Sequence, residues 1–361
     1  MALPVFDPSE NFFDPLYDSL YLSSKNVETH CRLGWRRYTR SFQKPLQTAH
    51  GVWDRREGLV LRLEDEQGSI GFGEIAPLPW FGSETLEAAI ALCTRLSAMG
   101  MELTGRQLAH VPDTLPACQF GLAIAWNALH SAQSSTTPNA GIPESAVLLP
   151  TGVAALDGWE SIWSVGAHTF KWKIGVESVG KELCTFQKIL AWLPNSSIIR
   201  LDANGGLSIS DACRWLEVCA TDERVEFLEQ PLPPSEFAAM QALSDRFPTP
   251  LALDESVATL SQLVACHQQG WHGVFVVKPA IAGSPYRLQA LCHQHHLDVV
   301  VSSVFETAIA RNFLQNSLLP ALPTPLRAPG LGTARWFPDD GFETTDFASL
   351  WQRLTPSSKT V

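Results

Sequence analysis

The sequence predicts an α/β protein in which a modified TIM barrel of the (β/α)7β type follows a smaller α+β domain. Through the second half of the 361-residue chain short apolar runs recur, and each one ends in a charged residue. The spacing is nearly constant, with 29 residues from Lys173 to Asp202 and 24 from Asp254 to Lys278, which is the length of one strand, one helix and two short loops. Charges at the ends of successive parallel strands emerge together on one rim of a closed barrel, where such folds carry out their chemistry.

Seven candidate strands can be counted in the barrel region, and an eighth is expected near Leu326. They are residues 146–150, 169–174, 198–202, 225–229, 251–254, 274–278 and 299–303. Stretches between them, such as 211–220 and 256–269, have helical apolar spacing, with Ser210 and Ser256 as expected caps. A doubly wound open sheet has similar spacing, but it would not bring five consecutive strand ends together, so we prefer the barrel.

The first part of the chain has a different pattern. Apolar and polar residues alternate from Arg32, and the alternation returns at 59–63 and 70–74, which predicts a small antiparallel sheet with hairpin connections. Ser83 is expected to cap the first of two helices that follow. The loop 75–82 between sheet and helix has two prolines, and on its residues alone we interpret it as a rigid turn in preference to a lid.

A polar stretch rich in helix- and strand-breaking residues, 133–141, is the best domain boundary in the chain. We therefore expect an N-terminal extension over residues 1–30, an α+β domain over 31–141 and a barrel domain over 142–330. The C-terminal tail, 331–361, is expected to contribute to the α+β domain.

Composition excludes several classes of function. The formal net charge of −11 argues against non-specific binding to nucleic acid or to an anionic membrane, because both prefer a basic surface. No apolar run approaches the ~18 residues of a membrane span, and the N-terminus lacks a basic and then apolar leader, so we expect a cytoplasmic protein. The eight cysteines include no C-x-x-C pair, which favours buried reduced thiols over a zinc site or disulfides. The sequence leaves the oligomeric state open.

Three of the strand-end charges are carboxylates, Asp202, Glu229 and Asp254, and they come from consecutive predicted strands. Oxygen ligands supplied by a few protein groups and water suit Mg²⁺. Three carboxylates crowded together would repel one another unless a cation lies between them. The alternative is that each carboxylate forms an ion pair with a surface Lys or Arg.

The other strand-end charges are lysines. Lys171 and Lys173 point to the same face of their strand because they are two residues apart, and Lys278 lies four strands further on, across the barrel. Inward-pointing lysines beside each other can lose proton affinity through burial and like-charge repulsion, which makes an amine available as a base near neutral pH. Arg200, two residues before Asp202, is as consistent with a structural ion pair as with a catalytic role.

The motifs K-x-K, D-x-N, E-Q-P, D-E-S and K-P at these strand ends resemble the enolase superfamily, specifically its muconate-lactonising subgroup. Segments 71–79, 302–306 and 329–333 are similar to the o-succinylbenzoate synthase family within that subgroup. The resemblance extends over about residues 32–335. It implies that the α+β domain is a capping domain for the barrel.

The resemblance also implies the chemistry, which is Mg²⁺-dependent proton abstraction alpha to the carboxylate of a small-molecule substrate. The implied residues are Lys173 and Lys278 as the catalytic pair, Asp202, Glu229 and Asp254 as metal ligands, and Lys171, Asn204, Ser302 and Ser303 as substrate-binding groups. Loops near His50 and Trp80 would form a lid over the substrate.

The activity implied is that of a carbon-oxygen lyase. Enzymes of the o-succinylbenzoate synthase family convert 2-succinyl-6-hydroxy-2,4-cyclohexadiene-1-carboxylate to 2-succinylbenzoate in menaquinone and phylloquinone biosynthesis. In this chain Lys173 would remove the ring proton and then protonate the leaving hydroxyl, while Lys278 would stay cationic on the opposite face.

Other functions remain possible on the same scaffold. An N-acylamino acid racemase or dipeptide epimerase would use both lysines as opposed acid and base. Dipeptide epimerases carry a D-x-D after the last barrel strand, and residues 333–340 lack it, which disfavours that alternative but not acylamino acid racemisation. A binding protein without catalysis would not need the complete set of carboxylates and lysines, and a Schiff-base lyase acting through Lys278 would not need the carboxylates.

Overall fold

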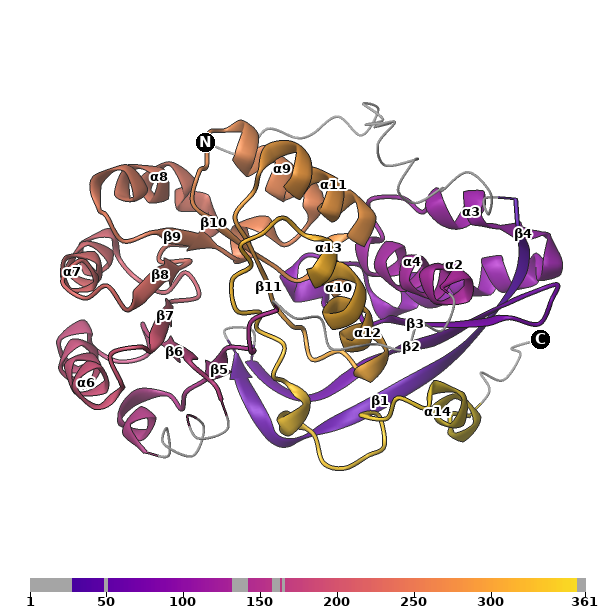
Figure 1. Cartoon of the computed structure of the whole chain (residues 1–361), viewed down its shortest axis with the longest axis horizontal. Helices are drawn as coiled ribbons and strands as arrows, with labels where there is room; N and C mark the ends of the chain where they lie inside the picture. The colour runs from indigo at the N-terminus through magenta and orange to yellow at the C-terminus, as the bar shows by residue number, and fades with distance from the viewer. Residues whose placement is uncertain (1–27, 49–50, 132–141, 158–162, 164–165, 356–361) are drawn as a thin grey trace.

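The computed structural model describes residues 28–48, 51–131, 142–157, 163 and 166–355. Most of the predicted N-terminal extension, His50 and the predicted linker 133–141 lie outside these residues, so the domain limits stay a prediction. Two parts stand side by side in Figure 1, a curved parallel sheet surrounded by helices and an antiparallel sheet covered by helices. The predicted α/β architecture is therefore confirmed.

The antiparallel sheet has the strand order β3-β2-β1-β4. Its strands are β1 (His30–Thr48), β2 (Gly51–Asp65), β3 (Ile70–Ile75) and β4 (Leu103–Thr104). Strands β1 and β2 form a long ribbon that extends from the small sheet toward the barrel (Figure 1). The antiparallel sheet predicted from the alternating pattern is confirmed, and the ribbon brings residues of the capping part close to the barrel rim.

Three helices cover this sheet, α2 (Leu86–Ala98), α3 (Gly105–Ala109) and α4 (Pro116–His130). Helix α4 is buried along almost its whole length, and it lies so close to β3 that a side chain at Gly71 or Gly73 would overlap its backbone. The predicted cap Ser83 is wrong, because Thr85 caps α2 and accepts from the Ala88 amide. The Ser83 hydroxyl is engaged elsewhere, where it accepts from the Leu78 amide at 2.6 Å.

The barrel sheet contains seven parallel strands in sequential order. They are β5 (Val147–Leu148), β6 (Thr169–Lys173), β7 (Ile198–Asp202), β8 (Val225–Glu229), β9 (Leu251–Leu253), β10 (Val274–Val277) and β11 (Val299–Val301). The outer helices are α6 (Val179–Trp192), α7 (Ile209–Cys219), α8 (Phe237–Arg246), α9 (Leu260–Gln268) and α11 (Pro285–His295). The seven strands counted from the recurring apolar runs are all present.

Two predicted helix caps in the barrel are wrong. Ser208 caps α7 by accepting from the Asp211 amide, so Ser210 lies inside the first turn. Thr259 caps α9, whereas Ser256 belongs to a preceding short turn (Glu255–Val257) where its amide and hydroxyl bond to the Gln230 side chain.

The eighth strand predicted near Leu326 is also wrong, since no strand forms there among the described residues. Pro323, Pro325 and Pro329 have no amide hydrogen to donate to a ladder. The two edges of the sheet are instead joined by a few backbone bonds. The Ala146 amide donates to the Pro329 carbonyl at 2.8 Å, and Gly330 forms a single parallel bridge with Ser302.

The remaining elements fill the junction between the two parts and the C-terminus. They are the helices α10 (Pro279–Ala282), α12 (Ala308–Phe313), α13 (Leu319–Ala321) and α14 (Phe347–Arg353), a π-helix (Leu314–Leu318) and short turns such as Pro79–Phe81. Arg36 of β1 stacks on the Trp351 ring of α14, with its guanidinium carbon 4.3 Å from the ring centroid. None of the described helices is long and apolar enough to cross a membrane.

Alternation along the strands divides the barrel interior into an apolar floor and a charged rim. The floor is a separate buried cluster made of Phe227, Ala252, Val274, Val276 and Val300. On β6, Phe170 and Trp172 point outward, and Trp172 packs against Phe186 and Trp215 of the surrounding helices. The lysines between them therefore point inward, as predicted, and the polar groups at the strand ends stand above the floor.

Candidate active site

Six charged side chains meet at the carboxyl ends of β6 to β10, and we call them the rim: Lys171, Lys173, Asp202, Glu229, Asp254 and Lys278. Their positions follow from strand register, since Lys173 lies opposite Asp202, and Asp202 opposite Glu229. The three carboxylates are buried, with side-chain exposures of 9% or less. The convergence predicted from the regular spacing is present.

Lysines of the rim pair with the carboxylates. The Lys171 ammonium lies 2.8 Å from Asp202 Oδ2 and 2.7 Å from Glu229 Oε1, and the Lys278 ammonium contacts Asp254 Oδ1. The described residues contain no group of three or more His, Cys, Asp or Glu side chains already arranged to hold a metal ion. The carboxylates thus pair with rim lysines and not with surface residues, which was the alternative considered from the sequence.

Burial and neighbouring charges shift the pKa values of the rim side chains in opposite directions. Burial raises the pKa of Glu229 to about 8, helped by the charges of Asp202 and Asp254. Burial would also raise the pKa of Asp202, but the adjacent Lys171 ammonium outweighs it and the net shift is downward. Burial would lower the pKa of Lys171, yet the charges of Asp202 and Glu229 raise it. The expected loss of proton affinity is therefore wrong for Lys171, because carboxylates surround it more closely than other lysines do.

Lys173 differs from the other two lysines. Its side chain is partly exposed on the inward face of β6, and it makes no hydrogen bond or ion pair with the described residues. Its ammonium is close enough to Asp202 to help lower the pKa of that carboxyl. Lys173 is thus the rim amine that is not committed to a carboxylate, and Lys278, directly after β10, faces it from across the barrel.

The loop 75–82 reaches the rim from the capping part. Lys278 Nζ lies 4.1 Å from the centroid of the Phe81 ring, a distance at which a cation is attracted to an aromatic face. Trp80 packs edge-on against Trp53 of β2 and keeps 42% of its surface exposed. Residue-level reasoning favoured a simple turn here and missed Phe81, although this loop was part of the lid implied by the family resemblance.

Two residues with left-handed backbones follow the carboxylates, Asn204 at φ 44° and Gln230 at φ 38°. Such backbone strain persists only where surrounding bonds fix it. The Asn204 amide donates to Asp202 Oδ1 at 3.0 Å. The Gln230 side chain accepts from the amides of Asp254 and Ser256, so it ties the end of β8 to the end of β9. Sequence reasoning quoted the E-Q-P motif without assigning Gln230 this role.

Unused oxygen atoms surround the carboxylates. The Asn204 side-chain amide donates to Glu255 Oε1 at 3.0 Å, but Asn204 Oδ1 and Glu255 Oε2 are buried and have no hydrogen-bond partner. Burial and the charge of Asp254 raise the pKa of Glu255 to about 7. Buried polar oxygens without partners are costly. A donor set made only of oxygens, with two of them unsatisfied, fits a hydrated hard cation such as Mg²⁺.

The predicted serines differ in availability. Ser302 follows β11 on the inward face that also carries Val300 and forms the bridge to Gly330. Ser303 is buried, and its hydroxyl bonds to Glu306 Oε2 and to the Phe305 amide, at 2.8 and 2.9 Å. Among the described residues Ser302 makes no side-chain hydrogen bond, so of the two it has the uncommitted hydroxyl.

Arg200 and the histidines near the end of α11 lie away from the rim. Arg200 forms an ion pair with Glu226 at 2.5 Å and donates to the Ala328 carbonyl, so it has the structural role that was one of its two alternatives. His293 bonds to the Ala321 carbonyl at the end of α11, and the His295 ring packs against His267. These histidines end a helix and take no part in the rim.

Comparison with known proteins agrees with both parts of the fold. Residues 156–327 match the family described as Enolase C-terminal domain-like, and residues 35–129 match the family described as MenC, N-terminal domain. The chain is 42% identical over 328 residues to o-succinylbenzoate synthase of Thermosynechococcus vestitus (strain NIES-2133 / IAM M-273 / BP-1), a match that covers 90% of this chain and 99% of the relative.

Solved structures give the same result at the level of the fold. The crystal structure of o-succinylbenzoate synthase from Thermosynechococcus elongatus BP-1, complexed with Mg in the active site, superposes with a TM-score of 0.81 at 41% identity. It covers 90% of this chain, which covers all of it in return. The L-Ala-D/L-Glu epimerase of Bacillus subtilis has a TM-score of 0.71 at 17% identity, covering 86% and 92% of the two chains, and this likeness concerns the fold alone.

Proposed function

The chain belongs to the o-succinylbenzoate synthase family of the enolase superfamily, and from this we propose that it is a Mg²⁺-dependent carbon-oxygen lyase. Its substrate is 2-succinyl-6-hydroxy-2,4-cyclohexadiene-1-carboxylate, and its product is 2-succinylbenzoate. The match to the MenC N-terminal family supports a role in menaquinone biosynthesis. Phylloquinone biosynthesis, which uses the same conversion, is an equally suitable context.

We assign the metal site to Asp202, Glu229 and Asp254, which come from three consecutive strands. Asn204 and Glu255 supply two unpartnered buried oxygens next to them. When bound, Mg²⁺ supplies Lewis-acid stabilisation for negative charge that develops on the substrate carboxylate. Lys171 pairs with two of these carboxylates. With a cation held there, its ammonium would lose part of these contacts and would be available to the substrate carboxylate.

The proton transfers fall to Lys173. Its amine takes the ring proton alpha to the substrate carboxylate, and the resulting ammonium returns that proton to the hydroxyl on the neighbouring ring carbon. The carbon-oxygen bond then breaks, water leaves, and the ring becomes aromatic. One positioned base that acts on one face of the ring suffices for both steps.

Lys278 acts by its charge. It lies on the opposite side of the barrel, its ammonium pairs with Asp254 and it sits over the Phe81 ring. A preorganised cation at this point stabilises the anionic transition state without giving up its proton. The difference between an uncommitted Lys173 and a paired Lys278 is the observation that carries the proposal, because it suits a one-base dehydration.

A racemase would need both lysines to exchange protons in turn. The paired state of Lys278 does not favour that reaction, and likeness to the dipeptide epimerase is limited to the fold. The dehydration also has an aromatic product, which makes its barrier intrinsically low.

Product analysis tests the proposal. The purified chain with Mg²⁺ should convert the cyclohexadiene to 2-succinylbenzoate with kcat/KM on the order of 10⁴ M⁻¹s⁻¹ or higher. It should racemise N-succinylamino acids far more slowly. Racemisation that is faster than dehydration would favour a racemase over the lyase. Full activity in excess chelator would show that the reaction does not need Mg²⁺.

A further inference from the structure

Arg56 of β2 is a buried arginine whose side chain bonds only to backbone carbonyls. Its exposure is 2%, and its guanidinium donates to the carbonyls of Val304 at 2.9 Å, Pro77 at 2.8 Å, Glu57 at 3.1 Å and Ala76. Two of these carbonyls belong to the loop 75–82 of the capping part, and one belongs to the loop that follows β11 of the barrel.

A charge in this position is costly, since burial without a bonded counter-ion disfavours the charged form. The cost is offset by four hydrogen bonds from all three nitrogens of the planar guanidinium and by the nearby carboxylates of Glu74 and Glu306. A shorter or more flexible side chain cannot bridge the same carbonyls, so the residue at 56 fixes how far the two loops stand from each other.

A second link joins the same two segments. Glu74, at the end of β3, accepts from the Thr307 amide at 2.9 Å, from the Thr307 hydroxyl at 2.6 Å and from the Tyr38 hydroxyl at 2.5 Å. We call Tyr38, Arg56, Glu74 and Thr307 the seam. The bond from Arg56 to Val304 and the bonds from Thr307 to Glu74 hold the barrel loop on either side of Phe305, which has a left-handed backbone at φ 64°.

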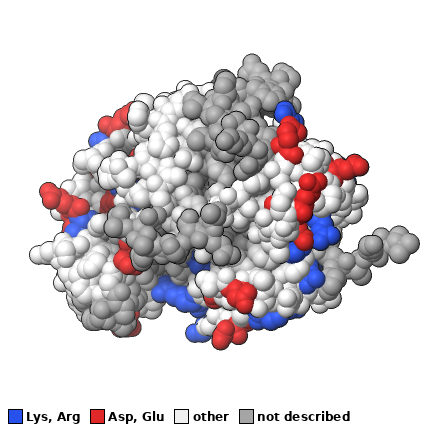
Figure 2. All heavy atoms as spheres, turned by 45° about the vertical axis from the view of Figure 1, so that its right-hand side comes forward, with Lys and Arg blue, Asp and Glu red and all other residues white. Residues whose placement is uncertain are grey.

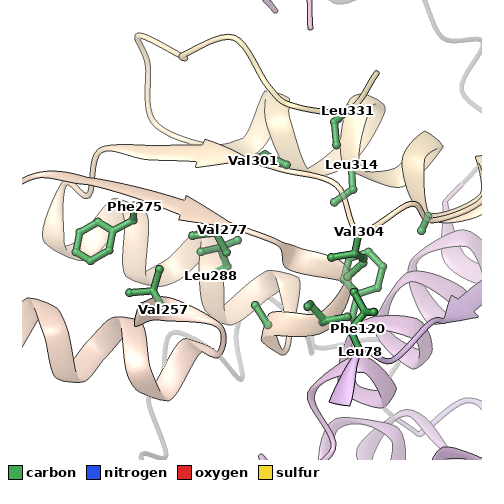
Figure 3. Close-up of a cluster of buried hydrophobic side chains, with 14 of the residues drawn as sticks. Leu78, Phe120, Val257, Phe275, Val277, Leu288, Val301, Val304, Leu314 and Leu331 are labelled. Atoms are coloured by element: carbon green, nitrogen blue, oxygen red, sulfur yellow. The ribbon is translucent and has the colours of Figure 1, made fainter. Parts of the chain in front are cut away.

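The seam leads to the rim through the loop 75–82. Arg56 holds the carbonyls of Ala76 and Pro77, and Leu78, the next residue, lies beside Val304 and Phe120 at the junction (Figure 3). A short turn (Pro79–Phe81) follows, fixed by the Phe81 amide to the Leu78 carbonyl at 2.9 Å. Phe81 then places its ring 4.1 Å from Lys278 Nζ.

We propose that Arg56 is a positioning residue for the reaction, which holds the loop 75–82 at the distance from the barrel that keeps Phe81 over Lys278. Arg56 does not touch the rim, so it acts through the loop. The expected effect of Arg56 on the reaction rate rests on the proposed function, in which Lys278 takes part in the reaction. The expected effect of Arg56 on the position of the loop 75–82 does not depend on that function.

Arg40 offers a matched control. It is an equally buried arginine of the same sheet, on β1, but its hydrogen bonds go to the carboxylates of Asp340 and Glu343 near the C-terminus and not to the loop 75–82. Arg56→Lys keeps the charge and loses the planar fork, and Arg56→Met removes both. Comparison with Arg40→Met separates a general loss of stability from a local effect on the loop.

Hydrogen exchange at the backbone amides of residues 78–83 is the first measurement. Arg56→Lys should raise exchange there by at least about tenfold, and Arg40→Met should leave it unchanged. Should Arg56→Met fail to fold, Arg56→Lys alone carries the test. Unchanged exchange in the loop of Arg56→Lys, or equal acceleration in Arg40→Met, overturns the proposal. This measurement needs no substrate, so its result is independent of the proposed function.

The second measurement is a double-mutant cycle on kcat/KM with Arg56→Lys and Phe81→Ala. Arg56→Lys should lower kcat/KM by about tenfold or more in the native background but by less than about threefold when Phe81→Ala is already present, because residues that act through one another are not additive. Additive losses would show that Arg56 does not act through Phe81. If the native chain itself leaves the cyclohexadiene unchanged, the proposed function fails while the exchange result stands.

Discussion

The rim and the seam both bury charged side chains, but they satisfy them in different ways. In the rim, three carboxylates share two lysines, a third lysine has no partner among the described residues, and oxygens of Asn204 and Glu255 are left without hydrogen bonds. In the seam, Glu74 accepts from three donor groups and Arg56 donates four hydrogen bonds. The ion pairs of the rim can therefore be replaced by contacts to a cation and a substrate, whereas the charged groups of the seam keep their hydrogen bonds within the protein.

This difference assigns ligand binding to the rim and support of the fold to the seam. A cluster with raised carboxylate pKa values and unpaired oxygens costs stability, and such costs are typical of sites that bind ligands. A fully bonded cluster contributes to the fold and to the spacing of loops. On the face drawn in Figure 2, acidic and basic side chains lie in small groups among neutral residues.

The largest expected effect comes from neutralising a rim carboxylate. Glu229→Gln should lower kcat by at least about 10³-fold and weaken Mg²⁺ binding, since it removes one of the proposed ligands. The metal-free protein should keep or raise its thermal midpoint. A buried carboxyl whose folded-state pKa is raised costs stability at pH values above its unfolded pKa, and glutamine removes that cost. Activity assays, metal titration and thermal melts check these outcomes.

Glu217→Gln, on the exposed surface of α7, is the control for this substitution and should behave as the native chain. A Glu229→Gln protein that turns over normally, or one that unfolds, would contradict the assignment of Glu229 to a ligand-binding rim.

The next effect distinguishes the two facing lysines. Lys173→Ala should lower exchange of the substrate alpha proton with solvent deuterium by about 10²- to 10⁴-fold, because the described residues place no other uncommitted amine on that face. Lys278→Ala should lose turnover and retain measurable exchange, since its role is electrostatic. Exchange that survives in Lys173→Ala and disappears in Lys278→Ala would require the two roles to be reversed.

In the seam the corresponding isosteric substitution should have the opposite effect on stability. Glu74→Gln replaces one acceptor oxygen by a donor, so the Thr307 amide and hydroxyl and the Tyr38 hydroxyl can no longer all be satisfied. The free energy of unfolding should fall by about 1–3 kcal/mol, with Mg²⁺ affinity unchanged. Denaturation midpoints and metal titration measure both quantities. A stable Glu74→Gln protein would remove the contrast between the two regions.

The rim could be predicted from the sequence because it depends on a local rule. Each charged residue ends a short apolar run, and equal spacing places the ends of parallel strands at one edge. Lys173, Asp202, Glu229, Asp254 and Lys278 follow from that rule alone. The rule does not specify which lysine forms an ion pair with which carboxylate. The close ion pairs that raise the pKa of Lys171 were therefore not predicted.

The seam could not be predicted in this way, because it joins residues far apart in the chain. The hydrogen bond from Arg56 to Val304 spans 248 residues, and the bond from Thr307 to Glu74 spans 233. No periodic pattern marks either pair. The missing eighth strand near Leu326 has a local cause, the prolines that surround it, which the apolar pattern concealed.

The smallest expected effect is the pH dependence of metal binding. A pKa of about 8 for Glu229 means that much of this carboxyl carries a proton at pH 7, and the proton must leave before a cation can bind. Apparent Mg²⁺ affinity should therefore rise with pH up to about 8 and then level off. Calorimetric titration in two buffers of different ionisation enthalpy should show proton release at pH 7 and none well above pH 8. Metal binding without proton release at pH 7 would place the cation away from Glu229.

We expect the rim to exchange the Lys171 ammonium for a divalent cation. A crystal structure grown with Mn²⁺ tests it directly through anomalous scattering. The account predicts one anomalous peak between the carboxylates of Asp202, Glu229 and Asp254, with the Lys171 ammonium displaced from its present position between Asp202 and Glu229. An anomalous peak elsewhere, with Lys171 still bridging those two carboxylates, would contradict it.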